Sequence, residues 1–70
     1  MATIVVTKGD LNWGKGEGSV DSKAGTASIT SWVDQAAMTV GTTYGLKTGG
    51  KSYTGKCQSS TLPINFTDVE

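Results

Sequence analysis

The N-terminus carries the strongest strand pattern in the chain. Residues 2–7 read ATIVVT, and β-branched side chains favour strands. Residues 8–10, KGD, are typical of a turn, and residues 11–13, LNW, are suited to begin a second strand. Residues 14–18 then alternate glycine with charge, GKGEG, which we interpret as a loop or a bulged edge.

The middle of the chain supports two interpretations. Residues 19–25 are polar and indicate a connection or a weak strand, whereas residues 27–33, ASITSWV, are suited to a strand. Apolar side chains then recur at the i, i+3, i+4 and i+7 spacing of a helix face, at Val33, Ala36, Ala37 and Val40. Gly41 stands where a helix C-cap belongs. This spacing predicts one short helix near residues 32–39.

The last third of the chain returns to strand patterns. The Gly49-Gly50 pair suits a type I′ hairpin turn, in which Leu46 pairs opposite Tyr53. Pro63 cannot donate a ladder hydrogen bond, so residues 62–67 are predicted to form an edge or terminal strand.

These elements predict one small domain over residues 1–70. The fold class is mainly β: a small antiparallel sheet, barrel or sandwich with at most one short helix, near residues 32–39, and α+β is the alternative. The residues predicted to be buried are Ile4, Val6, Ile29, Trp32, Val40, Leu46, Tyr53, Ile64 and Phe66. A chain this short buries only about 60% of its unfolded surface, and its one cysteine excludes an internal disulfide. We therefore expect a homo-oligomer or docking on a larger protein assembly.

Net charge and hydropathy limit the classes of partner that the sequence predicts. Six lysines offset six acidic residues, and arginine is absent, whereas nucleic-acid binders normally carry a basic excess. The apolar N-terminal run is too short for a membrane span. We expect no nucleic acid and no membrane partner.

Catalytic chemistry has little support in the sequence. Histidine is absent, so a serine or cysteine nucleophile has no ordinary general base. Cys57 is interpreted as a small, partly buried residue, and the scattered acidic residues lack a calcium-binding spacing. The sequence predicts a protein that is not an enzyme, with no catalytic residue, cofactor or metal.

Residues 45–52, GLKTGGKS, match the phosphate-binding pattern G-x-x-x-x-G-K-[ST]. A working P-loop follows a buried parallel strand and begins a helix whose N-terminus faces phosphate. Residues 40–44, VGTTY, are polar and interrupted by glycine, and residues 53–60 lack an apolar stripe. We therefore predict a hairpin turn here and no bound nucleotide.

Residues 11–20, LNWGKGEGSV, resemble the start of a cold-shock domain. That family forms five-stranded barrels whose aromatic side chains stack single-stranded bases. Trp13, Lys15, Gly16 and Gly18 match the family pattern, but Glu17 and Ser19 replace the stacking aromatics. The resemblance implies an OB-like nucleic-acid-binding module, with the departures placing that activity in doubt.

A further resemblance is to small phage virion structural proteins of tail-tube, connector or decoration type. It rests on residues 29–32 (ITSW), 42–45 (TTYG) and 50–55 (GKSYTG), where a strand ending in tryptophan precedes a threonine-rich segment and a glycine-punctuated hairpin. The resemblance implies a non-enzymatic subunit that assembles with copies of itself or with a larger capsid or tail lattice. The expected location is the virion if the chain comes from a phage and the cytoplasm otherwise. A small inhibitor that binds a host protein is the alternative.

Two stretches are predicted to contact the partner. The N-terminal run, residues 1–7, can add its edge to a neighbouring sheet, and the glycine-rich loop, residues 15–25, can order against a partner. The predicted contact residues are Thr3, Ile4, Val5, Val6, Lys15, Gly16 and Glu17.

Overall fold

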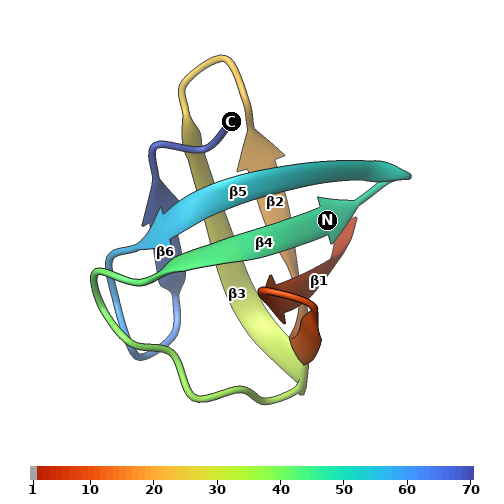
Figure 1. The fold of residues 1–70 in the computed structure, drawn as a ribbon, viewed down its shortest axis with the longest axis vertical. Coiled ribbons are helices and arrows are strands. Elements are labelled where there is room, and N and C mark those ends of the chain that lie inside the picture. The colour runs from red at the N-terminus through yellow and green to blue at the C-terminus, as the bar shows by residue number, and fades with distance from the viewer. Residues whose placement is uncertain (1) are drawn as a thin grey trace.

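The computed structural model describes residues 2–70, which form a closed barrel of antiparallel strands (Figure 1). The strands are β1 Ala2–Lys8, β2 Leu11–Asp21, β3 Thr26–Asp34, β4 Thr43–Thr48, β5 Lys51–Cys57 and β6 Ile64–Thr67. No helix occurs among these described residues. The mainly-β fold class and its barrel form are confirmed, and the α+β alternative is wrong.

The barrel consists of two meanders placed side by side. The strand order is β1-β2-β3-β6-β5-β4, and the barrel closes through the pairing of β1 with β4. Residues 35–42 connect the two meanders across one end of the barrel, at the bottom of Figure 1. The exposed surface is 4153 Å², close to the roughly 4,100 Å² expected of a compact folded chain of this mass.

The stretch predicted to be a loop at residues 14–18 lies within the longest strand, β2. Its alternation is that of a strand whose inner positions are glycine and whose outer positions are charged. A Cβ built on Gly16 would lie 2.7 Å from Ile29 Cγ2, and one on Gly18 would lie 1.9 Å from the Ser28 carbonyl oxygen. The interpretation as a loop is wrong because these glycines mark positions where β3 leaves no room for a side chain.

Irregularities in the β2 ladders change which side chains face inward. Lys15 pairs with Asp34 and Gly16 with Trp32, so β3 has an extra residue, Val33, between them. Another register shift makes Thr30 an extra residue of β3. Such bulges reverse the alternation of a strand, so that Trp32 packs partly against the core while Val33 is 58% exposed.

The predicted short helix near residues 32–39 is absent. β3 continues to Asp34, and the following residues are irregular. Their polar backbone groups find tertiary partners instead: the Thr39 N–H donates to the Tyr44 hydroxyl at 3.0 Å, and the Gly41 N–H donates to the Cys57 carbonyl at 2.9 Å. The residues at helical spacing form no buried face, because Val33 and Val40 are 58% and 55% exposed while Ala36 packs against the core.

The C-terminal strand is not an edge. β6 pairs with β3 on one side and with β5 on the other. Pro63 precedes β6 and therefore removes no donor from either ladder. The carbonyl of Pro63 accepts a 2.8 Å hydrogen bond from the Ser59 hydroxyl, whose oxygen accepts from the Asn65 N–H at 2.9 Å.

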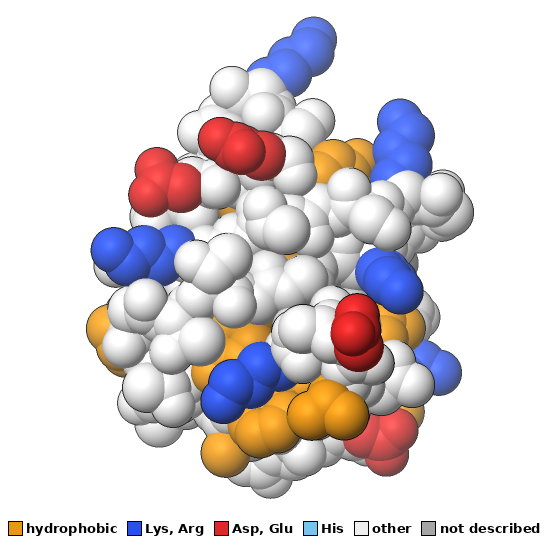
Figure 2. Space-filling model, viewed as in Figure 1, with side chains coloured by type: hydrophobic (Ala, Val, Ile, Leu, Met, Phe, Trp, Pro, Cys, Tyr) orange, Lys and Arg blue, Asp and Glu red, His pale blue; other side chains and the backbone are white. Residues whose placement is uncertain are grey.

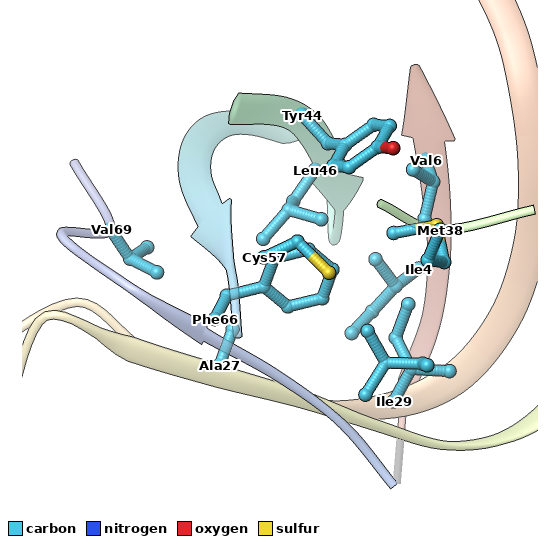
Figure 3. Packing of buried hydrophobic residues seen from close by; sticks show 11 residues of the cluster. Ile4, Val6, Ala27, Ile29, Met38, Tyr44, Leu46, Cys57, Phe66 and Val69 are labelled. Carbon is cyan, nitrogen blue, oxygen red and sulfur yellow. The ribbon is translucent and has the colours of Figure 1, made fainter. Parts of the chain in front are cut away.

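Side chains from five of the strands and from the 35–42 connection meet in one core (Figure 3). The correctly predicted buried residues are Ile4, Val6, Ile29, Leu46, Ile64 and Phe66. Trp32 and Tyr53 are only partly buried at its margin, and Val40 is exposed. The buried apolar residues that sequence patterning missed are Ala27, Met38, Tyr44, Cys57 and Val69.

Candidate binding surface

The two stretches predicted to contact a partner lie side by side in the barrel wall. In the β1–β2 ladder Thr3 pairs with Glu17, Ile4 with Gly16 and Val5 with Lys15. Sequence patterning does not indicate this adjacency, because it predicts a loop and not a strand at residues 14–18. The barrel therefore joins them into one continuous surface.

Strand alternation divides the predicted contact residues into two groups. Ile4 and Val6 are fully buried in the core, and Gly16 is also buried. These three face the interior, so their side chains cannot contact a partner of the folded barrel. The outward-facing group, which we name the outer β1–β2 face, comprises Thr3, Val5, Lys15 and Glu17.

The free edge expected of the N-terminal strand is largely occupied. Val5, Val6 and Thr7 pair with β4 as well as with β2. Residues 2–4 at the start of β1 and Lys8 at its end pair with β2 alone. Extension of the sheet by a partner strand is consequently restricted to these short ends of β1.

A cleft of about 510 Å³ adjoins the outer β1–β2 face. We name it the lysine cleft; its lining residues are Thr3, Val5, Lys15, Lys47, Thr48, Gly49, Gly50, Lys51 and Ser52. Figure 2 shows lysine side chains along the side of the molecule on which the tip of the β4–β5 hairpin lies in Figure 1. No acidic residue lines this cleft.

The phosphate-binding pattern of residues 45–52 forms the β4–β5 hairpin. Leu46 pairs with Tyr53 as predicted, and Gly49 and Gly50 have φ angles of 59° and 77°. Both angles lie in the left-handed region that a type I′ turn requires. The segment after the pattern is strand β5 instead of a helix, so the backbone amides of a P-loop have no counterpart here.

Trp13, the tryptophan shared with cold-shock domains, is engaged within the chain. Its indole Nε1–H donates to the Ala37 carbonyl at 2.7 Å, and Lys8 Nζ lies 4.8 Å from the centre of its ring. A cation over the ring occupies a face that a nucleic-acid base would need for stacking. Glu17 and Ser19, which stand where the family pattern has stacking aromatics, carry no ring.

Cys57 is fully buried, and its thiol donates to the Ser59 carbonyl at 3.0 Å. A thiol in this setting has no access to a substrate. Among residues 2–70, no group of three or more histidine, cysteine or acidic side chains is arranged to hold a metal. In the same part of the chain, no helix is long and apolar enough to cross a membrane.

Large aliphatic side chains are also exposed outside the lysine cleft. Leu11 is 64% exposed at the start of β2, and Val33 protrudes from the β3 bulge. Figure 2 shows apolar side chains gathering at the lower end of the molecule, where the β1–β2 turn and residues 35–42 lie in Figure 1.

Comparison with known proteins gave no match to a protein-family model, to a curated protein or to a solved structure.

Proposed function

We propose that this barrel is a non-enzymatic structural subunit that assembles with copies of itself, as the subunits of a phage virion lattice do. The observation that carries the proposal is the exposure of Leu11 and Val33, at 64% and 58%. Exposed aliphatic side chains concentrated in one region are typical of protein–protein contacts. The buried, hydrogen-bonded thiol of Cys57 supports a role without catalysis.

The two aliphatic residues are close enough for one interface to cover both. Leu11 lies four residues before Lys15 in β2, and Val33 lies next to Asp34, the ladder partner of Lys15. At about 3.3 Å per residue, the four residues from Leu11 to Lys15 span about 13 Å, and the step to the neighbouring strand adds about 5 Å. A standard interface covers about 800 Å² of each partner, roughly a fifth of the 4153 Å² surface.

The outer β1–β2 face supplies a polar border for such a contact. Lys15 and Glu17 are charged, Thr3 is polar, and Val5 is partly buried between its neighbours. Interfaces between folded proteins commonly combine an apolar centre with a polar rim of this kind. In this interface Leu11 and Val33 form the apolar centre. The polar rim consists of the outward-facing residues among the predicted contacts, Thr3, Val5, Lys15 and Glu17.

Light scattering on the purified protein tests self-assembly. We expect a concentration-dependent oligomer, and Leu11→Asp and Val33→Asp should each shift it toward monomer with unchanged circular dichroism. The matched control is Ser19→Asp, which changes an exposed residue of β2, the strand that carries Leu11. It should leave the oligomer intact. A wild-type protein that stays monomeric at millimolar concentration, or a control that dissociates equally, would contradict the proposal.

Copy number distinguishes a virion subunit from an inhibitor of a host factor. Mass spectrometry of purified particles from the source should detect many copies per particle if the chain is a structural subunit. An inhibitor would be absent from particles and would bind one host protein with a fixed stoichiometry. Tight binding of single-stranded DNA by a monomer would instead favour an OB-like module.

A further inference from the structure

Each lysine of the lysine cleft comes from a different strand. Lys15 belongs to β2, Lys47 to β4 and Lys51 to β5, yet all three line the same space of about 510 Å³. Lys47 and Lys51 also belong to the string that resembles a P-loop, while Lys15 is 32 positions away from Lys47 in the sequence. Only closure of the barrel brings the third lysine to the other two.

The strand register explains this convergence. Val5 pairs with Lys15 in β2 and with Lys47 in β4, so the two lysines occupy equivalent positions on either side of one residue. Directly opposed residues of antiparallel strands have Cβ atoms about 5 Å apart. Side chains as long as lysine can therefore bring both ammonium groups to a single ligand above Val5.

No acidic residue is among those that line the cleft, although Asp34 lies opposite Lys15 on β3. The other lining residues are neutral, and within residues 2–70 no ion pair engages the three lysines. Three like charges in one concave space repel each other, and the repulsion is relieved when an anion binds. The chain as a whole has no net charge, so this concentration of lysines is local.

The hairpin turn leaves the backbone accessible at one side of the cleft. Gly49 and Gly50 carry no side chain, and a Cβ built on either would meet no atom within 4 Å. A ligand can therefore approach the chain closely at this turn. Thr48 and Ser52 also line the cleft, and each carries a hydroxyl group, a type of group that can donate to an oxyanion.

Acidic residues limit the length of the anion that fits. Glu17 follows Lys15 by two positions on the outer side of β2, and Asp34 pairs with Lys15 from β3. A polyanion that continued from the cleft along β2 would meet both carboxylates. The arrangement thus favours a compact anion over a long nucleic-acid backbone.

We propose that the lysine cleft binds a compact phosphate- or sulfate-type anion that carries at least two negative charges. The anion is held by Lys15, Lys47 and Lys51, with no contact to a nucleobase and no magnesium requirement. It is either a free phosphorylated small molecule or a phosphorylated side chain of a partner protein. This site shares Thr3, Val5 and Lys15 with the polar rim of the proposed self-assembly interface, but it does not include the apolar centre, Leu11 and Val33.

Nuclear magnetic resonance titration with sodium pyrophosphate in about 0.15 M salt tests the site. We expect saturable shifts at the amides of Val5, Lys15 and residues 48–52. Lys47→Gln and Lys51→Gln should each weaken binding by roughly fivefold to tenfold, because each removes a charge-assisted contact. The control variants Lys23→Gln and Lys56→Gln remove equal charge outside the cleft and should change affinity by less than about twofold.

Two results would overturn the proposal. One is the absence of saturable binding up to about 10 mM pyrophosphate by a wild-type protein whose spectrum is that of a folded barrel. The other is an equal loss of affinity in the control variants, which would indicate a response to net charge alone. Thermal unfolding of every variant separates loss of the site from loss of the fold.

Additional ligands identify the source of the anion. A phosphoserine peptide that shifts the same amides more strongly than pyrophosphate would assign the site to a partner protein, whereas the reverse order would assign it to a small molecule. ATP should bind no more tightly than tripolyphosphate, and magnesium should weaken both. Much tighter binding of a long oligonucleotide, with shifts that extend past Glu17, would contradict a compact anion.

Discussion

Glycine serves opposite purposes in two parts of this barrel. In β2, Gly14, Gly16 and Gly18 face inward, and any Cβ there would collide with neighbouring atoms of β3 or the following segment. At the tip of the β4–β5 hairpin, Gly49 and Gly50 have positive φ angles and open space around them. The β2 glycines are required by lack of space, and the hairpin glycines by backbone conformation.

The difference shows why two similar sequences, GKGEG and KTGGK, form different structures. Alternation of glycine with charge at period two indicates a strand that passes close to another strand. Adjacent glycines permit the two successive left-handed residues of a tight turn. The spacing of the glycines, more than their number, carries the structural information.

The largest expected effect is that of Gly18→Ala. Its Cβ would lie 1.9 Å from the Ser28 carbonyl oxygen, which belongs to the backbone and cannot move without shifting β3. Overpacking of this kind costs about 3 kcal/mol, a large share of a small domain's stability. Urea denaturation measures the free energy of unfolding, and Ser19→Ala on the outer side of β2 is the control. A stability equal to wild type would mean that β2 does not approach β3 as described.

An intermediate effect is expected at the hairpin. Gly50→Val should lower the free energy of unfolding by about 1–2 kcal/mol, because a β-branched residue resists the left-handed conformation. Gly50→Asn should cost much less, since asparagine adopts that conformation more readily. Equal destabilisation of both variants would mean that lack of room for a side chain, and not the left-handed backbone conformation, requires glycine at this turn. The hairpin glycines would then not differ from those of β2.

The smallest effect is expected from the residue that follows the turn. Lys51→Ala should change the free energy of unfolding by no more than about 0.5 kcal/mol, because the side chain is exposed. Its oligomeric state in light scattering should match wild type, while pyrophosphate binding weakens. Calorimetry that detected micromolar, magnesium-dependent binding of ATP to the wild type would show that the hairpin acts as a P-loop after all.

Several features of the fold could be predicted from local sequence. The β-branched run at residues 2–7 forms a strand in which Ile4 and Val6 are buried, since alternation alone directs them to the same side. The Gly49-Gly50 turn and the Leu46–Tyr53 pairing follow from backbone conformation at two adjacent residues. Such features depend on interactions within a few residues and are therefore available to sequence analysis.

Other features depend on bulges and on long-range partners. Ile29 and Trp32 are an odd number of residues apart, and a regular strand cannot direct both inward; the bulge at Thr30 allows it. The apolar spacing from Val33 to Val40 suits a helix, but hydrogen bonds to Tyr44 and Cys57 hold part of this segment in an irregular conformation. No local pattern contains this information.

Local sequence patterns were sufficient to predict a small β domain, its strongest strand, its hairpin turn and much of its core. The tertiary structure was needed to show that the sheet closes, that Ile4 and Val6 are unavailable to a partner, and that Lys15 lines one cleft with Lys47 and Lys51. The physical reason is that strand propensity and turn conformation are properties of neighbouring residues. The convergence of three lysines is instead set by the register of strands that are distant in the chain.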